Sequence, residues 1–232
     1  MRNGTESATY RRILAIRQLL PHHTFLQYTA TPQAMLLINI IDVLSPNFAE
    51  VLTPGATYTG GHAFFEGDLS LTRRIPDADI PGVNHPLHEP PESLLEALRV
   101  FFLGVAVGIR GGENGNRSMM VHPSKETMSH GDYYQWVRNI QNLWGGILAD
   151  GESDPDYRDL IDDFHRAYGD LSSTVPDIPP FEELALPLRR AIRRTLVTEV
   201  NAARGQTPQP DWRQIYSHIV VGGEVLNRGY TL

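Results

Sequence analysis

The chain has 232 residues, 41% of them hydrophobic and 20% charged, which excludes a disordered protein and allows one large domain or two small ones. Its formal net charge is −7, so no overall positive charge indicates nucleic-acid binding, and the absence of Cys excludes disulfides and thiolate metal sites. The N-terminus lacks the apolar core of a signal peptide, and the most apolar run, 94–109, is interrupted by Glu96 and Arg99. We therefore expect a cytoplasmic protein without a membrane segment.

Lys125 is the only lysine, and it lies between Ser124 and Glu126. A Walker A loop needs Gly-Lys-Ser/Thr so that the ammonium reaches the β and γ phosphates of the nucleotide. The chain therefore carries no P-loop. A common nuclease arrangement, with a carboxylate two residues before a lysine, is excluded as well because position 123 is Pro. ATPase or nuclease chemistry built on those groups must come from elsewhere.

The first predicted elements are a helix and a strand. Apolar residues at helical spacing predict a helix over 10–20, and residues 22–28 are predicted to form a strand that runs into Thr29-Ala30-Thr31-Pro32. Threonine hydroxyls at a strand end can bond neighbouring backbone groups or a bound phosphate, and Pro32 suits the first turn of a helix over 33–43. Taken alone, the motif more often means a simple helix cap.

Two stretches rich in proline follow. Residues 44–67 combine Pro and Gly with aromatic residues, which predicts an ordered loop packed on the core. The second stretch contains His85, His88 and Glu89, which are potential metal ligands. The prolines around them exclude the helix that would gather the three side chains, so surface polar residues are favoured.

The clearest helix is predicted over 91–110, and we expect it to be buried because its apolar positions cover most of its circumference. The Gly-rich residues 111–116 predict a hinge. A strand from Arg117 is predicted to end in Val121-His122-Pro123-Ser124, before an amphipathic helix over 130–148. His122 could act in catalysis, but no carboxylate lies at a recognisable spacing, and a histidine at a strand end more often satisfies a backbone group.

The last third is predicted to be mainly helical. Its aspartates between 150 and 163 fit the solvent face of a helix better than a metal cluster. A long helix is predicted over 181–204, and it carries a basic patch that could contact phosphates: Arg189, Arg190, Arg193 and Arg194.

A final strand is predicted over 219–221, and it runs into Gly222 and Gly223, with Arg228 and Gly229 beyond. Ligands of open α/β sheets bind beyond the carboxyl ends of the strands, so this loop is a candidate site. A tight turn before a helix explains the same residues about equally well.

Three strand ends therefore carry candidate residues, in the order Thr29-Ala30-Thr31-Pro32, Val121-His122-Pro123-Ser124 and Gly222-Gly223. In order and spacing, this set resembles the Z1 (Z-one) domain family, a family of proposed endonucleases associated with superfamily-two helicases in bacterial restriction and defence loci. The resemblance covers essentially the whole chain. It also includes these motifs: Tyr28, Leu44 to Pro46, Tyr58 to Gly60, Phe64-Phe65 and Val221 to Leu232.

The resemblance implies an α/β fold in which RecA-like or helicase-like parallel sheet elements carry large helical insertions. Residues 1–75 would be the end of an incomplete first helicase-like lobe, and 76–116 a helical connector and hinge. Residues 117–232 would be a second lobe with a helical insertion at about 150–205, truncated at its C-terminal motif. Because the chain stops inside that motif, we expect either a segment of a longer protein or an unusual end.

The resemblance further implies DNA as a partner, with other restriction or defence proteins as additional partners. ATP and Mg are expected only for the complete protein, and no cofactor is expected in this chain alone, whose catalytic residues remain unidentified. The implied contacts to nucleic acid or nucleotide are Thr29, Thr31, His122, Ser124, Gly222, Gly223, Arg228 and Gly229.

Two other functions remain open. The chain could be a non-catalytic protein-interaction module of degenerate α/β fold, which would bind a partner through the helices between 91 and 204. The net charge of −7 and the missing P-loop favour this alternative. A metal-dependent hydrolase that uses His85, His88 and Glu89 is the least favoured hypothesis.

Overall fold

The computed structural model describes residues 7–29, 44–67, 71–82, 86–113, 115–123, 127–200, 211 and 213–223, without the side chains of 127–129. The chain divides into two compact units, Met1–Tyr58 and Thr59–Leu232. The expected connector, 76–116, thus lies in the same compact unit as the expected second lobe. The assignment of the two ends of the chain to helicase-like lobes remains a prediction.

In the first unit, α1 spans Ala8–Leu19, and the Ser7 hydroxyl accepts a hydrogen bond from the Tyr10 amide at 3.1 Å. This confirms the predicted helix over 10–20. The predicted strand over 22–28 is wrong, because those residues have no regular structure. A strand needs a neighbour to pair its backbone groups, and none lies beside it among the described residues of this unit. The predicted helix over 33–43 lies outside the described residues.

Residues 44–67 are irregular except for the short helix α3, Gly61–Phe65. The expectation that this stretch packs on the core is wrong for its large apolar side chains. Phe48, Val51 and Leu52 are each at least 75% exposed. The apolar residues here follow neither a helical nor an alternating period, so the stretch has no single apolar face to bury.

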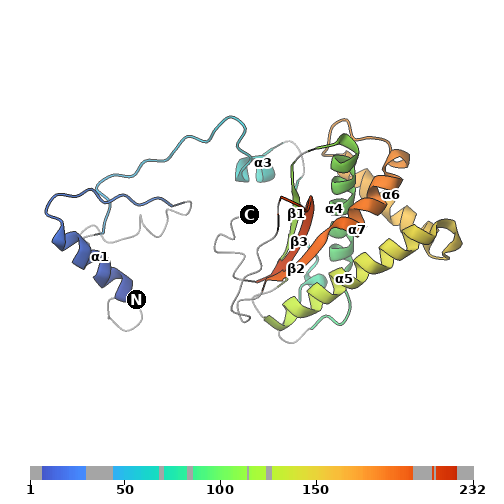
Figure 1. Ribbon diagram of the computed structural model, residues 1–232, viewed down its shortest axis with the longest axis horizontal. Helices are drawn as coiled ribbons and strands as arrows, with labels where there is room; N and C mark the ends of the chain where they lie inside the picture. The colour runs from blue at the N-terminus through green and yellow to red at the C-terminus, as the bar shows by residue number, and fades with distance from the viewer. Residues whose placement is uncertain are drawn as a thin grey trace. The chain divides into compact units, whose positions relative to one another are not determined.

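The second unit contains a parallel sheet built from β1 (Arg117–Val121), β2 (Leu196–Val200) and β3 (Ser217–Gly222). The strand order among the described residues is β1-β3-β2, so β3 is central (Figure 1). Val121 lies opposite Val221, and Val200 lies opposite Gly222. The predicted strands at 117 and 219 are confirmed, and the fold is α/β.

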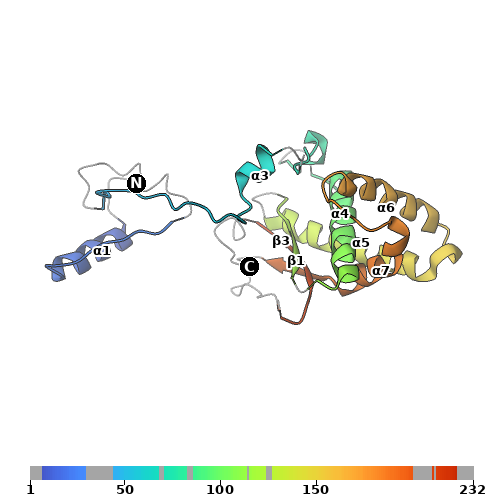
Figure 2. The ribbon, with the colours of Figure 1, turned by 90° about the horizontal axis from the view of Figure 1, so that it is seen from above.

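Four long helices accompany the sheet, and Figures 1 and 2 show them on one side of it. They are α4 (Glu92–Gly111), α5 (Thr127–Asp150), α6 (Tyr157–Ser172) and α7 (Ala185–Arg194). Helix α5 contacts β2 and β3, whereas α4 packs against α6 and α7. Short 3-10 turns lie before α4 at Asp77–Asp79, between α5 and α6 at Gly151–Ser153, and before α7 at Phe181–Leu184.

Helix α4 confirms the prediction of a buried helix over 91–110. Its residues Leu98, Phe102 and Leu103 are fully buried in the core. The helix ends at Gly111 and is capped by Gly112, whose φ of 66° is a left-handed conformation that favours glycine. In the described part of the chain, no helix is both long and apolar enough to cross a membrane.

The predicted helix over 181–204 is wrong in its second half. The chain forms a 3-10 turn and then α7, which ends at Arg194, and residues 196–200 form strand β2. The β-branched residues Thr195, Val197, Thr198 and Val200 favour the strand, and pairing with β3 satisfies its backbone. The region expected to be a helical insertion, about 150–205, therefore supplies one strand of the sheet.

Candidate nucleic-acid interface

Two of the predicted strand ends meet at one edge of the sheet. Strands β1 and β3 are parallel neighbours, with Val121 opposite Val221. His122 follows β1, and Gly222 and Gly223 close β3, so these residues leave the sheet side by side. Because the carboxyl ends of parallel strands share one edge, this is where ligands of open α/β sheets bind.

His130 joins this group from the first turn of α5. Its side chain is 2% exposed, whereas His122 is exposed, and the two ring centroids are 6.5 Å apart with planes tilted by 48°. Helix α5 follows β1 after a short connection, so its N-terminal turn lies at the carboxyl edge of the sheet. The edge therefore carries two imidazoles, one open to solvent and one enclosed.

Gly223 is buried directly under the His130 ring. A Cβ added at this position would lie 2.6 Å from His130 Nε2 and closer still to Cε1, which is shorter than real contacts allow. The ring thus occupies the space that any larger residue would need, and glycine is required here for packing. The same lack of a side chain lets other groups approach the backbone closely.

Two titratable residues of this unit have shifted pKa values: His218, near the amino end of β3, and Tyr133, one turn after His130 on α5. Burial lowers the pKa of His218, and hydrogen bonds to backbone groups oppose the shift only in part; its Nε2 lies 3.1 Å from the Ile215 carbonyl oxygen. Burial raises the pKa of Tyr133, and the charge of Asp79 raises it further. Both shifts favour the neutral form, so these side chains act as uncharged parts of the core at neutral pH.

The described site residues of this edge offer imidazole and backbone groups. His122, His130, Gly222 and Gly223 provide hydrogen bonds but neither a carboxylate for Mg nor a lysine for nucleotide phosphates. These four residues therefore do not fit an autonomous ATP site. Among the described residues, no group of three or more His, Cys, Asp or Glu side chains could hold a metal ion.

The predicted site residues divide into three sets. His122, Gly222 and Gly223 lie together at the edge of the sheet. Thr29 is an exposed residue of the first compact unit, for which no relation to this edge is assigned. The remaining predicted contacts lie outside the described residues: Thr31, Ser124, Arg228 and Gly229.

His130 is the site residue that the sequence pattern did not reveal. It was expected only as the first residue of an amphipathic helix. The order of elements could have pointed to it. A helix that follows a strand in an α/β unit begins at the carboxyl edge of the sheet, where its first turn can reach a ligand. Only the position of Gly223, 93 residues later in the chain, shows that the ring faces the end of β3.

The match to a known family covers most of the unit that contains this edge. Residues 93–232 match the Z1 domain. The chain belongs to the Z1 domain family. The matched part of the Z1 domain includes His122, His130 and the Gly222-Gly223 pair, whereas Thr29 and Thr31 precede it. No curated protein and no solved structure matches the chain.

Proposed function

We propose that this Z1 domain is a helicase-like nucleic-acid-binding module of a bacterial DNA restriction or defence system. The observation that carries the proposal is the meeting of His122 with the Gly222-Gly223 pair at one sheet edge, beneath the His130 ring. Imidazole and backbone amide groups contact phosphate oxygens without reading base sequence. The domain would thus hold the DNA backbone at the carboxyl edge of its sheet.

Family membership supports the remaining parts of the proposal. The parallel strands are compatible with the RecA-like lobe that the sequence resemblance implies, and endonuclease action is proposed on that resemblance alone. Thr29, Thr31, Ser124, Arg228 and Gly229 would add further backbone or nucleotide contacts. ATP and Mg would be used only when a longer protein supplies the P-loop and the acidic residues that these positions lack.

The test is DNA binding by the Gly223→Ala variant. Fluorescence anisotropy with labelled single-stranded and double-stranded DNA, over a series of salt concentrations, measures the affinity. The added methyl group must displace the His130 ring or the end of β3, so we expect affinity to fall at least about tenfold, the effect of about 1.4 kcal/mol. Unchanged affinity in a folded Gly223→Ala protein would refute the proposal.

Two further variants separate local geometry from general destabilisation. Gly146→Ala adds the same methyl group on α5, where no atom lies within 4 Å of the new Cβ, and should leave DNA binding unchanged. His130→Ala removes the ring that Gly223→Ala would strike. Combining the two substitutions should restore the strand geometry, and a melting curve for each variant shows whether it folds.

A second candidate is the protein-interaction module. A hollow of about 200 Å³ lies between α5, α6 and α7, and its rim includes Leu186, which is 67% exposed. An exposed apolar side chain beside such a hollow suits the anchor residue of a partner protein. A partner that binds the wild type but not Leu186→Asp, together with no measurable DNA affinity, would favour this function over the first.

A further inference from the structure

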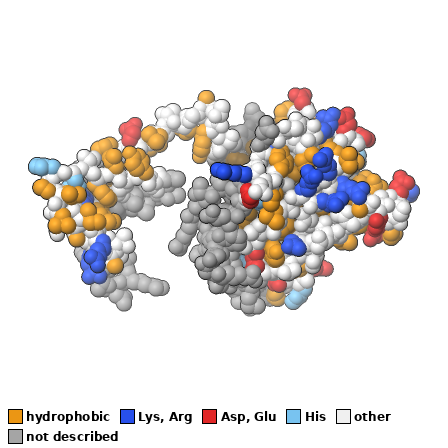
Figure 3. All heavy atoms as spheres, in the orientation of Figure 1, with side chains coloured by type: hydrophobic (Ala, Val, Ile, Leu, Met, Phe, Trp, Pro, Cys, Tyr) orange, Lys and Arg blue, Asp and Glu red, His pale blue; other side chains and the backbone are white. Residues whose placement is uncertain are grey.

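A basic surface lies on the helical side of the unit, away from the edge that carries His122 and Gly223. We call it the α5–α7 arginine surface. Arginines occupy two neighbouring rows of α7, on the side away from its buried residues Leu188, Ala191 and Ile192. Figure 3 shows Lys and Arg side chains gathered over this region. The surface consists of Arg138 on α5 and Arg189, Arg190, Arg193 and Arg194 on α7.

The arginines of this surface have no carboxylate partners among the described residues. Ion pairs in the described part of the chain engage arginines elsewhere, such as Arg99 with Asp163 and Arg110 with Glu183. The chain carries 27 acidic residues against 20 basic ones, so acidic side chains are not scarce. Because none of these five arginines forms an ion pair among the described residues, the surface concentrates positive charge on an otherwise acidic protein.

A groove of about 430 Å³ runs along this surface between α5 and the start of β2. Arg138 and Arg193 line it together with the neutral side chains of Gln141, Asn142 and Thr195, and none of its described lining residues carries a carboxylate. Arg138 is held in place, because its Nη1 lies 3.3 Å from the Tyr134 hydroxyl and its guanidinium lies over the Tyr134 ring. The groove therefore presents the positioned Arg138 guanidinium, with Arg193 and neutral polar groups beside it.

The surface lies at the opposite end of the sheet from the proposed DNA contact. Thr195 precedes β2, so the groove adjoins the amino ends of the parallel strands, whereas His122 and Gly223 follow the carboxyl ends. Along α5, His130 and Gly145 are 15 residues apart, which is about 22 Å at 1.5 Å per residue. One small ligand cannot bridge both places, and a polymer can.

We propose that the α5–α7 arginine surface is a second binding site, which takes the phosphodiester backbone of a nucleic acid independently of its sequence. Guanidinium groups bind phosphate oxygens in pairs of parallel hydrogen bonds, and amide or hydroxyl groups complete such contacts. Residues four apart on α7, such as Arg189 and Arg193, lie one above the other and form a row of charges along the helix.

A polyanion fits this surface better than an acidic protein does. The buried core of a protein interface is depleted in charge, because removing five like charges from water is costly. A nucleic acid releases its condensed counterions when arginines replace them, which drives binding without full burial. The helix dipole explains arginines in the last turn of α7, Arg193 and Arg194, but not Arg189, Arg190 or Arg138.

The test uses the full chain and the double variant Arg189→Gln/Arg193→Gln. Anisotropy with a labelled 20-nucleotide strand and a 20-base-pair duplex, between 50 and 200 mM NaCl, gives the affinity and its salt slope. We expect the variant to bind at least about tenfold more weakly at 50 mM salt, and its log–log slope to be shallower by about 2, one per lost phosphate contact.

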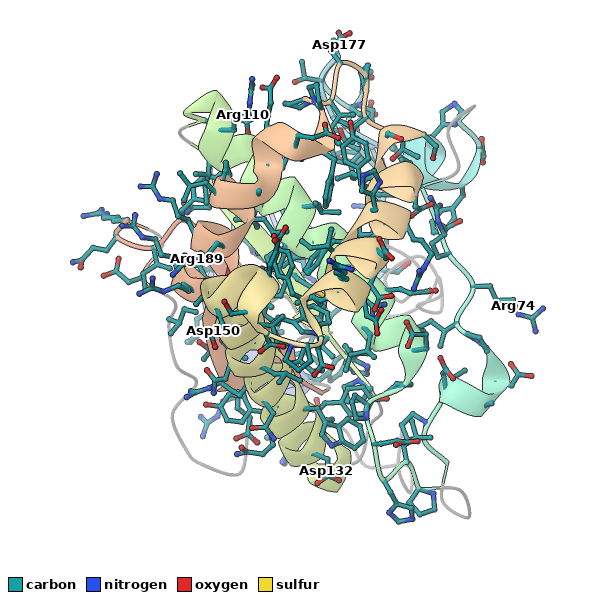
Figure 4. The ribbon with its side chains drawn as sticks, turned by 90° about the vertical axis from the view of Figure 1, so that its right-hand side faces the viewer. Arg74, Arg110, Asp132, Asp150, Asp177 and Arg189 are labelled. Carbon is teal, nitrogen blue, oxygen red and sulfur yellow. The ribbon has the colours of Figure 1, made fainter. Side chains whose placement is uncertain are left out.

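The matched control removes the same number of charges elsewhere. Arg73 and Arg74 are paired with Asp170 and Asp77, respectively, and Figure 4 shows Arg74 on the opposite flank from Arg189. Arg73→Gln/Arg74→Gln should keep the wild-type affinity and slope. An equal loss in this control would show that only net charge matters and would overturn the proposal.

The remaining outcomes separate this inference from the proposed function. If Gly223→Ala abolishes binding while Arg189→Gln/Arg193→Gln binds like the wild type, the sheet edge is the DNA site and the arginine surface is not. If Gly223→Ala binds like the wild type while Arg189→Gln/Arg193→Gln loses binding, the arginine surface is the DNA site and the sheet edge is not. Absence of DNA binding at 50 mM salt overturns the nucleic-acid assignment of the arginine surface.

Discussion

Arginine has opposite surroundings on the two sides of the helical layer. Arg99 on α4 is 7% exposed, and its guanidinium lies 2.6 Å from Glu92 and 2.5 Å from Asp163. It also lies over the Trp144 ring, 5.4 Å from the centroid. Arg193 on α7 is exposed and makes no ion pair within the described residues. The positions of the carboxylates therefore decide which arginines stabilise the fold through ion pairs and which can contact a ligand. The number of arginines matters less.

The two sides also differ in the groups whose hydrogen bonds join the neighbouring elements. On the α4–α6 side, charged groups join the helices through Arg99 and Asp163. On the α5–α7 side, the neutral Gln141 amide donates to the carbonyl oxygens of Ile192 and Thr195, at 2.6 and 2.7 Å. Because the neutral Gln141 side chain makes these hydrogen bonds, the arginines of α7 are not used in them. If the comparison is correct, substitutions on the two sides should affect stability by different amounts.

The largest effect is expected on the α4–α6 side. Asp163→Asn leaves the buried Arg99 guanidinium with only Glu92, whose side chain is 62% exposed. Removing one partner of a buried pair costs about 3 to 5 kcal/mol, and we expect about 2 to 3 kcal/mol because Asp163 is itself 25% exposed. Urea unfolding measures the loss. Asp162→Asn, an exposed neighbour on α6, should stay within about 0.5 kcal/mol, and a similar loss in both variants would contradict the comparison.

A smaller effect on stability is expected when the Gln141 side chain is removed. Gln141→Ala removes the donor to two carbonyl oxygens, each costing about 1 kcal/mol or more when left without a partner. Water can enter the open groove and replace part of this loss, so we expect a decrease of about 1 to 2 kcal/mol in the free energy of unfolding. Asn142→Ala removes the same amide group one residue later, where the side chain is exposed, and should be nearly neutral. Equal free energies of unfolding for the two variants would show that the Gln141 hydrogen bonds do not stabilise the fold.

The smallest effect on stability is expected from Arg193→Gln. An exposed cation without a carboxylate contributes little, so the free energy of unfolding should change by no more than about 0.5 kcal/mol. Thermal melts at low and high salt measure this change. A loss above about 1 kcal/mol would show that Arg193 stabilises the fold, and the contrast between the two sides would then fail. Together with weaker DNA binding by Arg189→Gln/Arg193→Gln, a neutral result would assign this surface to binding.

In the second unit, the sequence correctly predicted helices and strands where the apolar residues followed a single periodicity. The apolar residues of α4 and the β-branched run before Gly222 each gave the correct element, because both patterns depend on near neighbours in the chain. Strand β2 was missed because Leu196, Val197 and Val200 continue the apolar pattern of α7. Pairing with β3 decides this segment, and that contact is not local.

For the candidate site, the sequence identified His122, Gly222 and Gly223 separately, as residues at strand ends. It could not show that β1 and β3 are neighbours, since the two strands lie almost a hundred residues apart and β2 precedes β3 in the chain. It also gave His130 no role beyond its helix. The conflict between a side chain at position 223 and the imidazole ring exists only when both are placed in space.

By itself, the sequence determined the lack of a P-loop, the buried helix α4, the strands that end at Val121 and Gly222, and the resemblance to the family that the match over residues 93–232 confirms. Composition, periodicity and motif order are properties of the chain alone, so no folding is needed to see them. The tertiary structure alone decided the strand order, the meeting of His122, His130 and Gly223, and which arginines form ion pairs among the described residues. These features depend on contacts between distant segments, which local patterns do not encode.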